Sequence, residues 1–244
     1  MKRTELIMGM PITIEIVAPQ DAKIFDKIFD YFRRIDDQYS PYKPDSELSK
    51  INQGLSAEFW SDEMKQVLAL CAETKDLSGG YFDVYKHGRL DPSGLVKGWA
   101  ILNAANMLKV AGINDFYIEA GGDIQLSGHN EAGDLWSVGI RNPFNIDEVV
   151  KVLKLTDCGI ATSGTYLRGD HIYNPHANFQ AATNIKSLSV VGPNVYEADR
   201  FATAAFAMGV NGLGYINALP GFDGYMINDQ QRATYTQGFE LHVA

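Results

Sequence analysis

Asp91-Pro92-Ser93-Gly94-Leu95-Val96-Lys97-Gly98-Trp99-Ala100 joins an acid, a tight turn and a lysine to the start of an apolar, helix-compatible segment. The proline–serine pair suits a turn, and the two glycines let the backbone come close to a bound group. Near the start of the following helix, Lys97 would lie among free N–H groups that favour an anion. Asp91 could hold a hydroxyl, a ring nitrogen or a cation. Because the same pattern also fits a purely structural helix start, its meaning depends on the rest of the chain.

The composition bounds the class of protein. The chain has 244 residues, of which 45% are hydrophobic and 21% charged, and this balance is typical of a globular protein with a sizeable core. The formal net charge of −9 argues against a nucleic-acid partner, because phosphate backbones bind to basic surfaces. An anionic ligand would therefore be held locally, by a few placed groups or by a metal ion.

Cysteine usage and the N-terminal stretch bear on the compartment. Cys71 and Cys158 lie far apart and match no metal-binding spacing, so each is expected to be a small buried apolar residue. The first 17 residues, MKRTELIMGMPITIEIV, end in the alternation of a strand at Ile12, Ile14 and Ile16. No signal peptide, lipid-attachment cysteine or membrane-spanning run is visible in the sequence. We therefore expect a cytoplasmic protein without membrane insertion.

Several segments have the apolar spacing or the capping signals of helices. Residues 21–39 carry an apolar stripe at helical spacing, and residues 47–52 form a short polar segment. Ser61 caps a helix that Gly79-Gly80 stops. The helix that follows the opening stretch ends near residue 112, and two further helices are expected at 197–208 and 212–219.

From residue 116 onwards, most segments have the composition of strands. We expect strands at 116–120, 136–140, 149–155 and 185–191. A C-terminal hairpin would pair 225–227 with 234–243. Because helices and strands are mixed, with no repeat or linker between them, the sequence predicts an α+β fold. Its core would be a central mixed, largely antiparallel sheet with flanking helices.

Asp199 and Thr203 lie four residues apart on a predicted helix, so both side chains project from the same face. Carboxylate and hydroxyl oxygens are hard ligands that suit Mg²⁺, which takes one or two protein groups and completes its shell with water and phosphate. The alternative is a local hydrogen bond between side chains, with no metal.

Polar and aromatic loop residues offer further candidates. His171 lies close in sequence to Arg168, where it could act as a general base, donate to a phosphate or brace the loop. Gly121-Gly122-Asp123 puts an acid after a strand, which suits either a ligand site or a simple chain reversal. Tyr42 and the run Tyr81-Phe82-Asp83 present aromatic faces that could stack on a planar ring, or could belong to the core.

Taken in order, these pieces resemble the landmarks of the FAD:protein FMN transferase family, the ApbE-like flavin transferases. Eight short motifs in the family's order span nearly the whole chain, and this ordered set is more specific than any one of them. The motifs are Met8-Gly9, Tyr42 with Ser46-Glu47-Leu48-Ser49, Gly80-Tyr81-Phe82-Asp83, the opening stretch from Asp91 to Gly98, Gly121-Gly122-Asp123, Thr162-Ser163-Gly164, His171 to Pro175, and Asp199 to Thr203.

The resemblance implies a single α+β domain over residues 1–244 that binds FAD and Mg²⁺. It implies transfer of FMN onto a threonine or serine hydroxyl of a target protein, with release of AMP. By position, the family's metal ligands match Asp199, Thr203 and the backbone carbonyl of Gly94. Its FAD contacts match Met8, Tyr42, Tyr81, Phe82, Asp83, Asp91, Lys97 and Ile172. His171 would either activate the incoming hydroxyl or bond the reacting phosphate, and Asp199 would share in catalysis by holding the metal.

The chain departs from the family pattern in three places. The family writes His-x-x-Asp-Pro-Arg-Thr-Gly where this chain has Asn174-Pro175-His176-Ala177-Asn178 after His171. The stretch between Tyr166 and His171 is short, and a methionine at position 10 follows the Met8-Gly9 pair in place of threonine. The rim of the site beside the pyrophosphate is therefore expected to differ. Without an export signal, the expected target is a cytoplasmic partner such as a flavin-dependent reductase.

Two other functions are compatible with the same residues. Water in place of the protein hydroxyl would give an FAD pyrophosphatase that releases FMN and AMP. A protein that holds FAD without turnover is the third possibility, favoured if the altered loop after His171 is unproductive.

Overall fold

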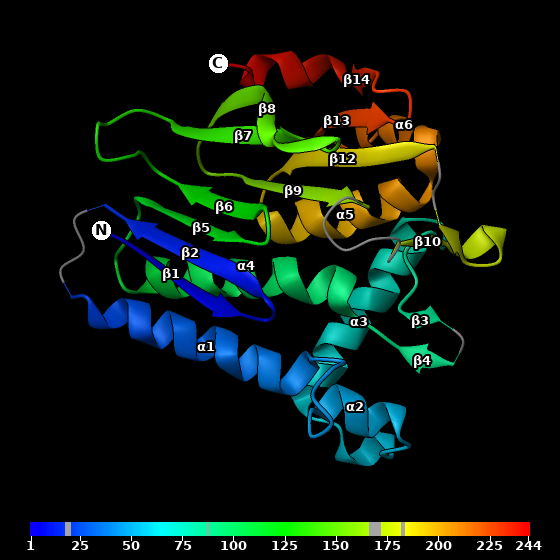
Figure 1. Cartoon of the computed structure of the whole chain (residues 1–244). Helices are drawn as coiled ribbons and strands as arrows, with labels where there is room; N and C mark the ends of the chain where they lie inside the picture. The colour runs from blue at the N-terminus through cyan, green and yellow to red at the C-terminus, as the bar shows by residue number, and fades with distance from the viewer. Residues whose placement is uncertain (18–20, 87, 166–171, 182–183) are drawn as a thin grey trace.

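A computed structural model describes residues 1–17, 21–86, 88–165, 172–181 and 184–244 (Figure 1). Its centre is an eight-stranded sheet in the order β1-β2-β5-β6-β9-β12-β13-β14, and each neighbouring pair runs antiparallel. The strands are β1 (Lys2–Ile7), β2 (Met10–Ile16), β5 (Phe116–Ala120), β6 (Asp123–Ser127), β9 (Gly159–Gly164), β12 (Ile185–Gly192), β13 (Asp223–Asn228) and β14 (Ala233–Tyr235).

Helices and three small sheets surround this sheet. The helices are α1 (Lys23–Tyr39), α2 (Glu47–Asn52), α3 (Asp62–Leu77), α4 (Ser93–Val110), α5 (Val195–Ala207) and α6 (Gly212–Asn217). The small sheets are β3 (Tyr85–Lys86) with β4 (Arg89–Leu90), β7 (Trp136–Asn142) with β8 (Asn145–Leu155), and β10 (Tyr173–Asn174) with β11 (Gln180–Ala181). Short 3₁₀ helices are η1 (Ala57–Phe59), η2 (Pro175–Ala177), η3 (Gly209–Asn211) and η4 (Gln237–His242). The predicted α+β class is confirmed.

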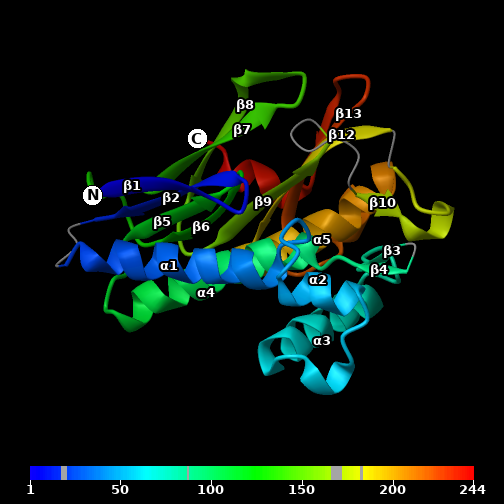
Figure 2. The same cartoon turned by 60° about the horizontal axis from the view of Figure 1, so that its bottom comes forward.

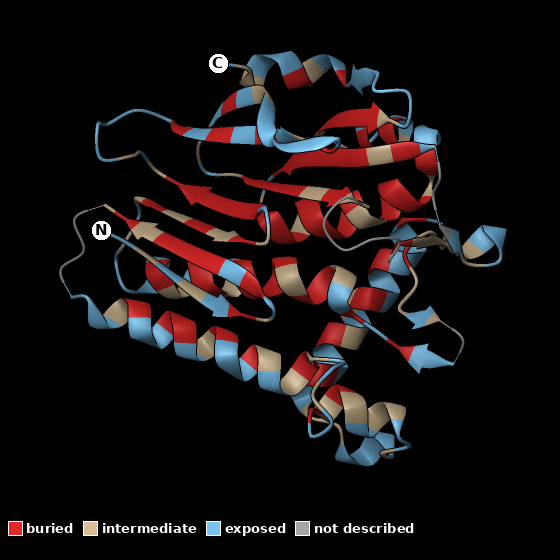
Figure 3. Ribbon diagram, viewed as in Figure 1, coloured by how far each residue is buried: buried red, intermediate tan, exposed pale blue. Residues whose placement is uncertain are grey.

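The large sheet separates two layers. Helices α1, α4 and α5 cover one face, whereas the β7–β8 hairpin and η4 lie on the other side (Figures 1 and 2). The inner strands from β2 to β13 and the sheet-facing sides of the helices are largely buried, whereas the edge strands β1 and β14 are mostly exposed (Figure 3). Helices α2 and α3 extend from one end of this body, next to the small β3–β4 hairpin (Figure 2).

Helix α1 confirms the apolar stripe read from the sequence. Phe25, Ile28, Phe29 and Phe32 are fully buried against the sheet, while charged residues face solvent. No side-chain hydrogen bond caps its first turn at position 22, although Asp21 accepts a hydrogen bond from the backbone N–H two residues on. Burial of the stripe, more than local capping, therefore holds this helix in place.

Helices α4 and α5 are apolar on most sides and cross in the interior of the protein (Figure 2). Their backbones approach most closely at Gly98. A Cβ atom there would lie 2.7 Å from Cβ of Asp199 and 2.9 Å from the carbonyl oxygen of Val195. Glycine at position 98 is therefore required by the crossing, and this crossing brings residues about 100 positions apart in the sequence into contact.

The structure differs from the sequence-based prediction at several strands. The N-terminal stretch folds into two strands, because Met8 and Gly9 form a tight turn with φ of 57° and 70°. Gly121-Gly122 is likewise a reversal, between β5 and β6, and β6 and β9 were not predicted as strands. β8 begins at residue 145, four residues before the predicted start.

The predicted C-terminal strand at 234–243 is wrong beyond residue 235. The chain turns into η4 after three paired residues of β14. The physical reason is the burial of Phe239, whose ring packs 5.2 Å from that of Tyr225. Asp223 adds two side-chain contacts, since it accepts from the Thr236 hydroxyl at 2.6 Å and lies 3.0 Å from Nε2 of His242.

The cysteines behave largely as expected. Cys71 is buried in the core of α3, and burial raises the pKa of its thiol to about 12, whereas Cys158 is half-buried. Within the described ranges, every helix falls short of the length and apolarity that a bilayer crossing needs.

Gly98→Ala should destabilise the protein by about 1–3 kcal/mol, because the added methyl group has to displace the backbone of α5. In a helix with free space, the same change stabilises by about 1 kcal/mol. The control is therefore Gly214→Ala in α6, where nothing lies within 4 Å of the new methyl group. Denaturant unfolding of both variants measures the difference, and a Gly98→Ala protein as stable as the wild type would contradict the tight crossing.

Candidate active site

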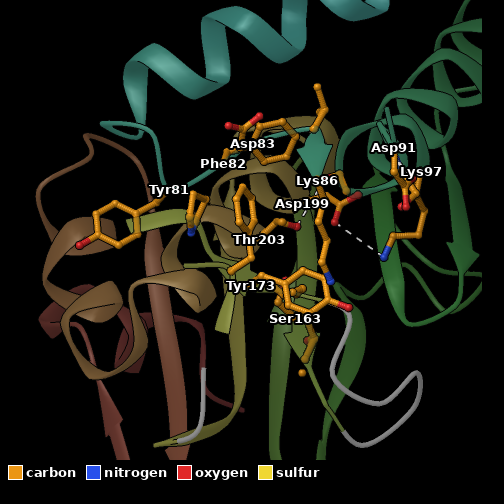
Figure 4. Close-up of a pocket in the computed structure, with 18 of the residues that line it drawn as sticks. Tyr81, Phe82, Asp83, Lys86, Asp91, Lys97, Ser163, Tyr173, Asp199 and Thr203 are labelled. Carbon is orange, nitrogen blue, oxygen red and sulfur yellow. Dashed lines mark hydrogen bonds and ion pairs between the residues drawn. The ribbon is translucent and has the colours of Figure 1, made fainter. Parts of the chain in front are cut away.

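A pocket opens where the first turns of α4 face α5, beside the β3–β4 and β10–β11 hairpins and the end of β9 (Figure 4). Its empty volume is about 1090 Å³, which includes open solvent at its mouth. Nine of the residues predicted from the sequence line it. They are Tyr81, Phe82, Asp83, Asp91, Gly94, Lys97, Ile172, Asp199 and Thr203.

Three predicted site residues are not among those that line the pocket. Met8 lies in the turn between β1 and β2 and packs against the core formed by α1 and α4. Tyr42 is 92% exposed in the loop before α2. His171 lies outside the described residues. The structure therefore brings together the later motifs of the chain and leaves the two earliest ones outside the cavity.

Asp199 is a buried carboxylate on α5. Its Oδ2 accepts a hydrogen bond of 2.9 Å from the backbone N–H of Gly98, and its Oδ1 lies 3.7 Å from Nζ of Lys97 (Figure 4). Burial raises the pKa of the Asp199 carboxyl above its ordinary value; Lys97 opposes this rise and the neighbouring Asp123 adds to it. A buried acid with a raised pKa is stabilised in its charged form by any additional cation.

Thr203 lies one turn further along α5, facing the start of α4. Its Oγ1 donates a hydrogen bond of 3.4 Å to the carbonyl oxygen of Gly94. Together with the Asp199 carboxylate, these two groups form a set of hydroxyl, carbonyl and carboxylate oxygens, which are the donors that Mg²⁺ prefers. The described residues contain no cluster of three or more His, Cys, Asp or Glu side chains with metal-binding spacing. A cation at Asp199 would therefore take its remaining ligands from water or a substrate.

Asp123 is a buried acid beside this set to which the sequence analysis gave no definite role. It begins β6, is fully buried, and accepts a hydrogen bond of 3.0 Å from the backbone N–H of Thr162. Its other oxygen forms an ion pair with Lys97. Lys97 thus lies between two acids near the start of α4, and its contact with an anionic ligand stays a prediction. The signal in the sequence was an acid placed directly after a Gly-Gly turn.

The acids at the pocket rim already have partners in the protein. Asp91 accepts a hydrogen bond of 3.0 Å from the backbone N–H of Ser93, the first residue of α4. Asp83 pairs with Lys75 at 2.8 Å and accepts from the backbone N–H of Tyr85 at 2.9 Å. Asp83 therefore fixes the loop that carries Tyr81 and Phe82, which line the pocket, and Asp91 fixes the turn before α4.

His176, in the segment that departs from the family pattern, ties two walls of the pocket together. Its Nε2 lies 2.9 Å from the carbonyl oxygen of Gly79, and its ring packs edge-on against Tyr81 with centroids 4.6 Å apart. The segment around η2 is thereby fixed to the loop that follows α3.

The comparisons with known proteins agree with this arrangement. Residues 8–88 and 84–226 match the ApbE family, and these two segments span most of the chain. This chain belongs to the ApbE family.

Its curated relatives in the ApbE family include FAD:protein FMN transferases of Vibrio cholerae and Treponema pallidum. The first is 32% identical over 130 residues, which are 49% of this chain and 39% of the relative. The second is 28% identical over 169 residues, which are 62% of this chain and 46% of the relative. The matched part thus spans less than half the length of each.

Solved structures of the ApbE family share the fold. The flavin transferase ApbE from Vibrio cholerae superposes with a TM-score of 0.86 at 23% identity, over 99% of this chain and 98% of that one. The ApbE protein from Thermotoga maritima gives a TM-score of 0.88 at 18% identity, over 100% and 99% of the two chains. At these identities the likeness concerns the fold alone.

His176→Ala should loosen the pocket wall without unfolding the protein, because it removes one hydrogen bond and one ring contact between two loops. Hydrogen exchange is expected to quicken at residues 79–82 and 173–179 and to stay unchanged in β12. His242→Ala is the matched control, since its partner Asp223 lies in β13, and there only the C-terminal segment should exchange faster. Unchanged exchange at 79–82 in His176→Ala would show that the contact does not hold the wall.

Proposed function

We propose that this protein is a Mg²⁺-dependent flavin transferase that moves FMN from FAD onto a threonine or serine hydroxyl of a target protein and releases AMP. The observation that carries the proposal is the convergence of the Gly94 carbonyl, the Thr203 hydroxyl and the Asp199 carboxylate beside a pocket with an aromatic wall. Membership of the ApbE family supports the same function.

The protein would catalyse this reaction mainly by positioning the substrates and stabilising charge, without forming a covalent intermediate. The target hydroxyl attacks the phosphorus of the FMN half, the bond from that phosphorus to the bridging oxygen breaks, and AMP leaves with that oxygen. The hydroxyl proton passes to a base, a role we assign to His171 together with the alternative of bonding the reacting phosphate. Bound Mg²⁺ would neutralise charge on the phosphate oxygens.

The chain's own residues have distinct tasks in this proposal. Asp199, Thr203 and the Gly94 carbonyl hold the cation, while the rings of Tyr81 and Phe82 provide an apolar wall for a planar ring. Asp83 and Asp91 fix the loops that carry this wall and the start of α4. Lys97 balances the buried acids. Ile172, which lines the same pocket, and the more distant Met8 and Tyr42 remain proposed FAD contacts.

The partners of the reaction follow from this scheme. FAD is the substrate, and the acceptor is a protein with an accessible threonine or serine, for which a flavin-dependent reductase is the proposed example. The acidic net charge of −9 gives no reason to expect a nucleic-acid partner.

The test is to incubate the protein with FAD, Mg²⁺ and a candidate reductase and to weigh all products by mass spectrometry. Covalent FMN on the reductase together with AMP supports transfer. Free FMN with AMP, equal with and without the reductase, would replace transfer by FAD hydrolysis. Unchanged FAD that stays bound would indicate a storage protein.

Asp199→Ala should abolish Mg²⁺-dependent turnover, because the cation loses its one charged ligand in the proposed set. In the wild type, Mg²⁺ is expected to raise the melting temperature, and in Asp199→Ala this rise should vanish. Asp62→Ala, an exposed acid at the start of α3, serves as the control that keeps both properties. Full activity and full Mg²⁺ stabilisation in Asp199→Ala would remove Asp199 from the metal site.

His171→Ala should lower kcat by about 10²–10⁴-fold, the usual contribution of general acid–base catalysis, with a smaller effect on FAD affinity. Steady-state kinetics and equilibrium FAD binding separate the two effects. His129→Ala, in the exposed turn after β6, is the control expected to match the wild type. A loss of FAD affinity with unchanged kcat would make His171 a binding residue.

A further inference from the structure

We infer that Asp123 is a positioning residue for the cation site: it takes the charge of Lys97, so that Asp199 keeps a net negative charge for a divalent cation. This inference rests on the proposed function and adds a residue outside the proposed ligand set.

The fold gives Asp123 a fixed place. It is the first residue of β6, opposite Ala120 across the turn, and its side chain is fully buried. The backbone N–H of Thr162 in β9 donates to its Oδ1 at 3.0 Å. One oxygen is therefore held by the sheet, and the other faces Lys97 on α4.

The ammonium group of Lys97 is not shared equally between the carboxylates of Asp123 and Asp199. Lys97 lies closer to Asp123 than to Asp199, from which it is separated by 3.7 Å. All three side chains are largely buried, with exposed fractions of 15% for Lys97, 0% for Asp123 and 5% for Asp199. Because two carboxylates share one ammonium group, the cluster carries one excess negative charge when all three are ionised.

The excess negative charge can bind a cation only if it lies on a carboxylate that lines the pocket. Asp123 is buried among Thr162 of β9, Lys97 of α4 and the Asp199 carboxyl of α5, and it is not among the residues that line the pocket. Asp199 does line the pocket, together with Gly94 and Thr203. If Lys97 had Asp199 as its single partner, the pair would be neutral and a divalent cation would meet a competing positive charge. Because Lys97 pairs more closely with Asp123, its positive charge opposes a cation at Asp199 less strongly.

The electrostatic role can be separated from a structural one. Asp123→Asn keeps an oxygen for the Thr162 N–H and the volume of the side chain, but it removes the charge. Binding of Mn²⁺, followed by electron paramagnetic resonance without flavin, measures the cation site independently of turnover. We expect the Mn²⁺ dissociation constant to rise about tenfold in Asp123→Asn, the size expected for one buried charge near the site.

The double variant Asp123→Asn/Lys97→Met is the deciding control, because it removes both opposite charges and restores the excess negative charge at Asp199. We expect it to recover at least half of the lost binding free energy, whereas a purely structural role predicts no recovery. If Asp123→Asn fails to fold, the double variant is compared with the wild type directly, and weak Mn²⁺ binding by a folded double variant overturns the inference.

The outcomes distinguish this inference from the function on which it rests. Equal Mn²⁺ binding by wild type and Asp123→Asn overturns the role of Asp123 and leaves the flavin transfer reaction intact. A wild type that binds no Mn²⁺ and transfers FMN without any divalent cation overturns the metal site itself, and the role of Asp123 with it.

Discussion

The backbone contact between α4 and α5 is the constraint on which the rest of the site depends. Gly98 lets the two helices approach until its N–H reaches the carboxylate of Asp199 at 2.9 Å. Gly94 lies one turn before Gly98, and Thr203 lies one turn after Asp199, so the same crossing also places these two opposite each other. A single packing geometry therefore aligns a carbonyl, a hydroxyl and a carboxylate at the floor of one pocket.

The charges at this crossing would be costly in an apolar core without compensation. Asp199 and Asp123 are both buried, and they are stabilised by Lys97 and by backbone N–H groups of Gly98 and Thr162. When all three side chains are ionised, the excess negative charge of this network is inferred to lie on Asp199, which lines the pocket. In the proposed function, an acidic protein would bind an anionic dinucleotide through a cation that Asp199, Thr203 and the Gly94 carbonyl would hold.

Much of this arrangement could be read from the sequence, and the limits have physical causes. The stripe of α1 and the four-residue spacing of Asp199 and Thr203 are local patterns, so they predicted helices and a shared face correctly. The burial of Asp123 depends on strand pairing across a Gly-Gly turn, and the end of β14 depends on where Phe239 packs. Such long-range contacts leave no periodic signal in the chain.

The most direct test of this account is a crystal structure of the protein with FAD and Mn²⁺, in which anomalous scattering locates the metal. We predict a metal ion bound by the Gly94 carbonyl, the Thr203 hydroxyl and the Asp199 carboxylate, with the pyrophosphate of FAD beside it in the pocket. A metal ion at any other place, or FAD bound outside the space between the first turns of α4 and α5, would contradict the account.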